Sequence, residues 1–134
     1  MSSVSEFVEA VSRAEEAYEF MISYAGQGIG REIPTKDVRE IRIYLNQLRE
    51  ALQDSVTTGK EIPEEFDIDG EEHFYDVVDQ MEVESEDAVE ILDLLIAQDR
   101  ITSQQVDNLN GMSVFQSIVM KMFFLEEIVG HLDE

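Results

Sequence analysis

The chain has 134 residues, of which 43% are hydrophobic, and it carries 31 acidic against 9 basic residues for a formal net charge of -22. This composition favours one folded domain over residues 1–134 and argues against wholesale disorder, while the absence of cysteine excludes disulfides and thiolate metal sites. Such a negative field repels nucleic acid and anionic membranes and attracts cations and basic protein surfaces.

The N-terminal sequence MSSVSEFVEAV has neither the basic segment nor the long apolar segment of a secretory signal. The most apolar stretch, residues 112–129, is interrupted by Lys121 and two glutamates and is too short to span a bilayer comfortably. We therefore expect a soluble, cytoplasmic protein. Salt adaptation is an alternative explanation of the acidic composition, and it would assign the charge no function.

Two helices are predicted in the first half of the chain, near 4–25 and 35–57. In each, apolar residues recur at alternating steps of three and four, which places them on one helical face. In the first helix these residues are Phe7, Val11, Ala14, Tyr18, Met21 and Ala25. In the second helix they are Val38, Ile41, Leu45, Leu48 and Leu52.

Glycine and proline mark the ends of these two helices. The pattern G-[RK]-E-I-P occurs at 30–34 and again at 59–63. Because glycine favours helix ends and proline cannot continue a helix, Gly59 is predicted to end the second helix. The basic residues of this helix are expected to pair with acids on neighbouring helices. They are Lys36, Arg39, Arg42 and Arg49.

The segment 61–99 contains no lysine or arginine and holds 16 of the 31 acidic residues. Its apolar pattern predicts a third helix near 71–97, and a break into two helices at Ser85 is the alternative. The positions predicted to face the other helices are Phe74, Val78, Met81, Ser85, Ala88, Leu92 and Leu95. An acidic stripe on the opposite face, which also carries Val83 and Leu94, is the predicted partner-binding surface. Its carboxylates are Glu72, Asp76, Asp79, Glu86, Glu90 and Asp93.

Residues 65–76 resemble the calcium-binding loop of EF-hands, because oxygen ligands at alternate positions are followed by a glycine turn. The resemblance implies calcium ligands at Glu65, Asp67, Asp69, Glu71 and Asp76. The sequence departs from the family pattern at Glu65, where aspartate is usual, and at Asp76, where a longer bidentate glutamate is expected. The alternative is an acidic loop that starts a helix, where carboxylates suit the helix dipole.

A last helical stretch is predicted over 103–129. Thr102 and Gln105 form a capping box at its start, and Asn110-Gly111 predicts a break or kink. Twelve of the eighteen residues in 112–129 are apolar, more than one helical face can hold. This helix is therefore either the one around which the others pack, or one that also meets a second copy of the chain in a homodimer.

No catalytic residue is predicted, because no Ser, Thr or Tyr has a base at a motif spacing and the two histidines, His73 and His131, have surface-like contexts. The predicted fold is an all-α, antiparallel four-helix bundle. The predicted function is that of a non-enzymatic adaptor or regulator without a cofactor, docking through the acidic helix 71–97 on a basic protein surface. A DNA-mimic inhibitor is its sharpest form, and a calcium-binding protein using residues 65–76 is the alternative.

Overall fold

A computed structural model describes residues 2–27 and 35–134. This part of the chain is all-helical, with five helices and no strand. The helices are α1 (Ser3–Gln27), α2 (Thr35–Glu65), α3 (Glu71–Ile96), α4 (Ser103–Asn110) and α5 (Ser113–Val129). The first copy of the G-[RK]-E-I-P pattern, at 30–34, lies outside the described residues.

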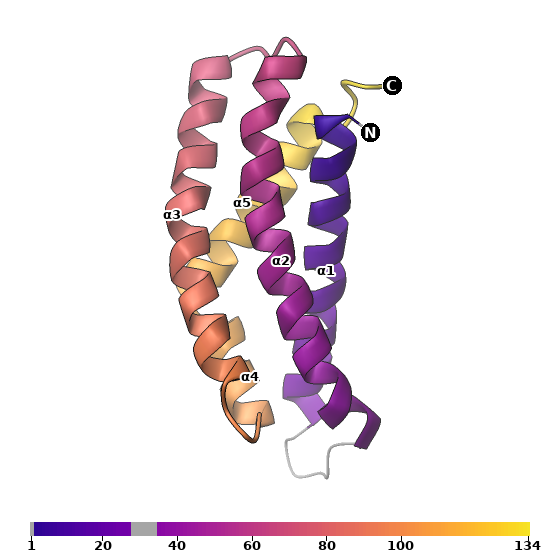
Figure 1. The fold of residues 1–134 in the computed structure, drawn as a ribbon, viewed down its shortest axis with the longest axis vertical. Coiled ribbons are helices and arrows are strands. Elements are labelled where there is room, and N and C mark those ends of the chain that lie inside the picture. Colours follow the sequence, from indigo (N-terminus) through magenta and orange to yellow (C-terminus); the bar gives the residue numbers. More distant parts are fainter. Residues whose placement is uncertain (1, 28–34) are drawn as a thin grey trace.

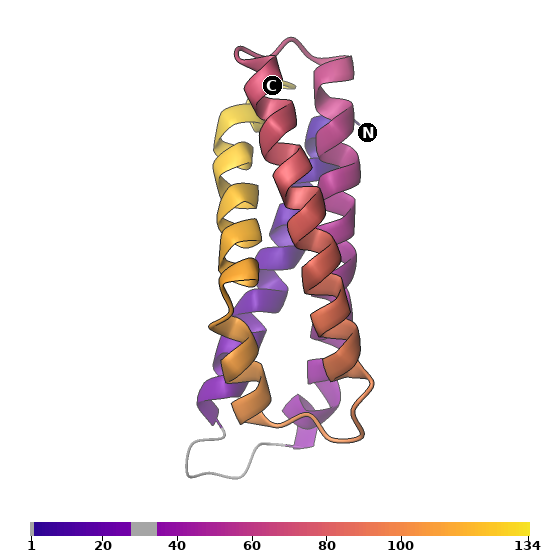
Figure 2. The same ribbon diagram turned by 90° about the vertical axis from the view of Figure 1, so that its left-hand side faces the viewer.

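The helices lie side by side along one long axis (Figure 1). α1 packs mainly against α2 and also contacts α4 and α5, whereas α3 packs between α2 and α5. Figure 2 shows α3 in front, with α5 beside it and α1 behind. α3 therefore keeps one long side free of other helices.

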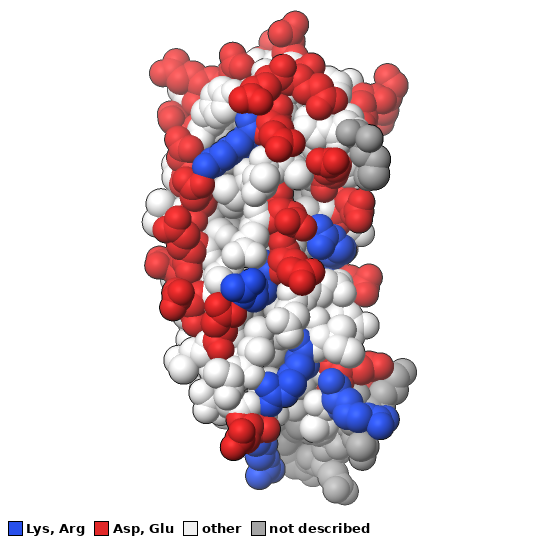
Figure 3. Space-filling model, in the orientation of Figure 1, with Lys and Arg blue, Asp and Glu red and all other residues white. Residues whose placement is uncertain are grey.

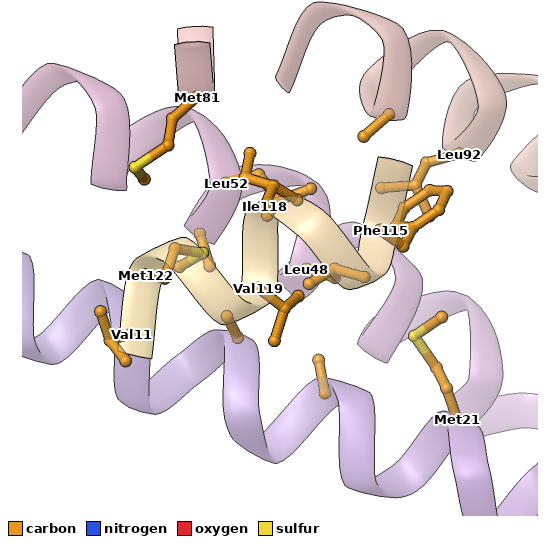
Figure 4. Close-up of a cluster of buried hydrophobic side chains, with 14 of the residues drawn as sticks. Val11, Met21, Leu48, Leu52, Met81, Leu92, Phe115, Ile118, Val119 and Met122 are labelled. Carbon is orange, nitrogen blue, oxygen red and sulfur yellow. The ribbon is translucent and has the colours of Figure 1, made fainter. Parts of the chain in front are cut away.

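The core draws buried side chains from all five helices. Figure 4 shows Ile118 of α5 next to Leu52 of α2, and Phe115 of α5 next to Leu92 of α3. The burial pattern predicted for α3 is confirmed in full, because all seven predicted inward positions are buried. In α2 the pattern is confirmed from Ile41 to Leu52, but Val38 at its start is 48% exposed.

α2 does not end near residue 57 as predicted but continues through Gly59 and Pro63 to Glu65. Gly59 lies where α2 approaches two neighbours, since a Cβ there would lie 3.4 Å from Val78 and 3.7 Å from Phe7. Ile62 is fully buried, so the extra turns continue the core. Pro63 lies in the last turn of α2, where its missing N–H leaves the carbonyl of Gly59 without its helical donor, and the helix ends two residues later.

The fourth predicted helix, 103–129, is two helices that meet at Gly111–Met112, where Asn110-Gly111 indicated a break. The capping box of Thr102 and Gln105 is confirmed. Tyr24 of α1 donates a hydrogen bond to the carbonyl of Ile101 at 2.6 Å, and Tyr18 donates to that of Asn110 at 3.0 Å. Two tyrosines of α1 thus hold both ends of α4.

Candidate protein-binding surface

The outer face of α3 is a single, unbroken helical surface. Ser85 does not interrupt the helix and is buried. Glu72, Asp76, Asp79, Glu86 and Glu90 are exposed, and no ion pair joins them to any described residue. Figure 3 shows acidic side chains in a column along α3, at the left of the view. The structure thus places these five residues together, as predicted.

Asp93 differs from the other five members of the predicted stripe. Its two carboxylate oxygens accept hydrogen bonds from the Arg49 guanidinium of α2, at 2.6 Å from Nε and 3.3 Å from Nη2. The Asp93 bond raises the pKa of Arg49 above its ordinary value. Arg49 thus pairs with a neighbouring acid as predicted, and Asp93 is already occupied.

The other basic residues of α2 that were predicted to pair with acids differ in their surroundings. Arg42 does not pair with an acid but donates to the carbonyls of Ile96 and Gln98, and to that of Asp99 at 3.1 Å. These bonds satisfy carbonyls at the end of α3, where a cation also suits the helix dipole. Arg39 is exposed. The surroundings of the Lys36 side chain lie outside the described part of the structure.

Two further ion pairs tie the flanks of α3 to its neighbours. Lys60 of α2 bonds to Glu82, and Lys121 of α5 lies 2.9 Å from Glu84. These pairs neutralise the carboxylates that point sideways and leave the outward ones charged. The sequence interpretation omitted Asp87, which is exposed and lies four residues after Val83 on the same face. The spacing alone was enough to find it.

Exposed apolar side chains interrupt the acidic face. Val83 is 61% exposed and Leu94 is 67% exposed, so neither is used by the core. Leu94 also lines an apolar groove of about 310 Å³ between α3 and α4, together with Ile91, Leu109 and Met112. No local sequence signal predicted this groove, because it depends on how α4 packs against the end of α3.

A second groove, of about 670 Å³, lies between α2 and α3. Its walls contain three carboxylates, three neutral polar side chains and two valines. The lining residues are Gln53, Val56, Thr57, Glu82, Ser85, Glu86, Val89 and Glu90. Two members of the predicted stripe, Glu86 and Glu90, thus face a concave surface as well as the solvent.

The EF-hand-like segment is divided between α2, a short loop and α3. Glu65 ends α2 and accepts a hydrogen bond of 3.1 Å from the backbone N–H of Ser3 at the start of α1. Glu71 is already the first residue of α3, so its carbonyl, the ligand expected at the seventh loop position, enters the helical hydrogen bonding. Among the described residues, no group of three or more His, Asp or Glu side chains is placed to hold a metal ion. The five predicted ligands are therefore not gathered into a site.

The outward face of α5 carries an apolar stripe at residues 120, 124 and 128, beside the exposed Glu127. Its inward face buries Phe115, Ile118 and Met122, but Met120 is 64% exposed, Phe124 58% and Ile128 42%. α5 is therefore not surrounded by the other helices, and its surplus apolar surface is open in the single chain.

No family model, curated protein or solved structure matches this chain. Within the described residues, no helix is long and apolar enough to cross a membrane.

Proposed function

We propose that this protein is a non-enzymatic adaptor or regulator that docks on a basic protein surface through the outer face of α3. The observation that carries the proposal is the unpaired state of the five outward carboxylates, Glu72, Asp76, Asp79, Glu86 and Glu90, among the described residues. Asp87 extends this surface, whereas Asp93 supports it only indirectly, through Arg49.

The arrangement of charge and apolar surface on α3 suits a protein partner. Unpaired carboxylates on a rigid helix attract a basic surface over a distance and speed its association. Val83 and Leu94 add apolar contacts whose burial gives the complex affinity and selectivity that charge alone does not. The groove beside Leu94 can accept an apolar side chain of the same partner.

The sharpest form of the proposal is a DNA mimic. The stripe from Glu72 to Asp93 spans 21 residues, or roughly 31 Å of helix at about 1.5 Å per residue. A DNA strand carries about one charge per 3.4 Å, so the stripe is sparser than a strand. This wider charge spacing suits a partner whose basic groove also accepts apolar side chains better than a partner whose groove binds only phosphate groups.

We also propose that α4 and α5 together act as the fourth member of an antiparallel four-helix bundle forming one domain over residues 1–134. The bonds from Tyr18 and Tyr24 support this, because they hold the α4 segment against α1. The bundle then serves as a scaffold that keeps α3 straight.

Charge reversal tests the docking proposal. Asp76, Asp79, Glu86 and Glu90 are changed together to lysine, and affinity for the partner captured from host lysate is measured at several salt concentrations. We expect at least about a hundredfold loss of affinity and a flatter salt dependence, because four attractive contacts become repulsive.

The matched control reverses four exposed carboxylates elsewhere, Glu9, Glu16 and Glu19 of α1 with Glu127 of α5. Both quadruple variants change the net charge equally, so a general field effect lowers affinity equally in both. Equal losses, or an unchanged affinity and salt slope in the α3 variant, would show that α3 is not the docking surface.

A further inference from the structure

The groove between α2 and α3 is lined by a largely buried serine whose hydroxyl the fold does not use. Ser85 is only 5% exposed, and its hydroxyl makes no hydrogen bond to any described residue. Helical serines commonly bond back to the carbonyl one turn earlier, but the Ser85 hydroxyl does not, and its oxygen is not one of the fully buried unpartnered atoms of the described residues. Ser85 lines the groove, so its hydroxyl is available to a group that enters it.

Two ion pairs lie one helical turn beyond the two ends of the α2 wall. Lys60, four residues after Val56, bonds to Glu82, and Arg49, four residues before Gln53, bonds to Asp93. Between these bridges, Glu86 and Glu90 have no ion-pair partner among the described residues. The fold thus places a cation on either side of the groove and leaves Glu86 and Glu90 without an ion pair, although the charge of Arg49 acts on Glu90 through space.

The lining combines an apolar part with hydrogen-bond acceptors. Val56 and Val89 present buried methyl groups, and Thr57 adds a hydroxyl oxygen on the α2 side. The side-chain oxygen of Gln53 already accepts a hydrogen bond of 3.4 Å from Arg49. A lysine or arginine side chain has the matching construction, because its aliphatic stem covers apolar surface while its charged end reaches polar groups. The planar guanidinium offers five N–H donors, so it can bond to two carboxylates and a hydroxyl at once, which a compact ammonium does less well.

We infer that this groove is a binding slot for an arginine side chain presented by the basic partner. The stem lies against Val56 and Val89, and the guanidinium donates to Glu86, Glu90 and the hydroxyl of Ser85. The inference rests on the proposed function and refines it, because it assigns recognition to a concave site on one flank of α3 rather than to the whole stripe. The groove's volume leaves room for the chain segment that carries the arginine.

The test uses the full chain and a defined probe, the peptide Ac-RAARAAR-amide, with versions in which lysine or citrulline replaces every arginine. Methyl NMR spectra follow Val56 and Val89 in the groove, with Val83 on the outer face as the internal reference. We expect saturable shifts at the two groove valines and little change at Val83. The citrulline peptide should bind at least about tenfold more weakly, because it loses the charge-assisted hydrogen bonds.

Matched charge-neutralising variants locate the site. Glu86→Gln with Glu90→Gln should lower the affinity for the arginine peptide at least about tenfold, whereas Asp76→Asn with Asp79→Asn should lower it less than about threefold. Equal losses in the two variants, or shifts as large at Val83 as at Val89, would overturn the inference. That result would leave the docking proposal standing, since a diffuse acidic face also predicts it. Loss of partner binding only in the α1 and α5 control variant would instead overturn the docking proposal.

Discussion

The outer faces of the neighbouring helices α3 and α5 differ in chemical character. On α3 the exposed surface is acidic, with Val83 and Leu94 as isolated apolar positions. On α5 the exposed surface includes an apolar stripe, with Met120, Phe124 and Ile128 four residues apart on one side. The two helices nevertheless bury similar inward faces in one core.

This contrast separates the inward residues, which the packing of the fold requires, from the outward residues, which it does not require. The inward residues of both helices are fixed by packing, and they account for neither the acid on α3 nor the apolar stripe on α5. A face kept only for solubility would not carry the contiguous stripe of Met120, Phe124 and Ile128, because contiguous exposed apolar surface favours association. The difference between the two faces motivates two separate proposals, docking on a basic partner through α3 and contact with an apolar surface through α5.

The largest expected effect is on the free energy of unfolding, and it tests whether the inward and outward sides of α3 and α5 differ in their contribution to the fold. Leu92 and Met122 are fully buried, whereas Leu94 and Met120, two positions away in the same helices, are about two-thirds exposed. Leu92→Ala or Met122→Ala should lower the free energy of unfolding by about 2–5 kcal/mol, because each leaves a cavity in the core. Leu94→Ala and Met120→Ala should change it by less than about 0.5 kcal/mol.

Urea denaturation of the four single variants measures this difference, and each outward variant is the control for the inward one of the same residue type. If Leu94→Ala cost as much as Leu92→Ala, the outer face of α3 would be part of the fold, and its availability to a partner would be lost.

An intermediate effect is expected in self-association through α5. We propose that Met120, Phe124 and Ile128 face a second copy of the chain. The net charge of -22 opposes this contact, so dimers should form when salt shortens the screening length, which is about 10 Å at 0.1 M and about 3 Å at 1 M. Phe124→Ser should weaken the dimer at least about tenfold by removing an aromatic contact.

Sedimentation equilibrium at micromolar protein and increasing salt measures the dimer, with Val83→Ser on the acidic face as the matched control. A 15.3 kDa species at every salt concentration would mean that the apolar stripe does not join two copies. Equal weakening by Val83→Ser would place the contact on α3 instead.

The inward face of α3 was predictable from sequence because helical periodicity is a local property, and so were its start near Glu71 and the break at Asn110-Gly111. The end of α2 was not. Glycine and proline at 59–63 are local signals to stop, but the burial of Ile62 and the close approach of Val78 to Gly59 come from tertiary packing. Packing between distant segments overrode the local preference, as it often does.

For the candidate surface, too, the sequence predicted which residues share a helical face but not which contacts they make with other helices. Spacing placed Glu72 and Asp79 on the outer face, but it could not show that Asp93 is occupied, since that depends on the register of Arg49 on another helix. The α2–α3 groove depends on the same register, because Val56 and Val89 line it from different helices. The sequence pattern of one helix defines which residues share a face of that helix. A groove depends on the position of two helices relative to each other.

The smallest expected effect on the free energy of unfolding comes from neutralising one carboxylate at the C-terminal end of α5, compared with one at the N-terminal end of α3. Glu126 lies in the last turn of α5, and burial, followed by the charges of Glu15 and Glu127, raises its pKa above the ordinary value of 4.5. Its ionised form is therefore less favourable in the folded state than in the unfolded state. The folded state gains stability as the pH falls through the raised pKa, and the gain is complete below the unfolded value.

Glu126→Gln should accordingly raise the free energy of unfolding at pH 7 by up to about 0.5 kcal/mol and remove this part of its dependence on pH. Glu72→Gln is the matched control, because Glu72 lies in the first turn of α3, where a negative charge favours the helix dipole. That variant should lower the free energy of unfolding by about 0.3 kcal/mol. Urea denaturation of both variants between pH 4 and pH 7 measures the two signs. If both variants stabilised the protein equally at pH 7, relief of the overall negative charge would explain the gain, and the local cost at Glu126 would not be needed.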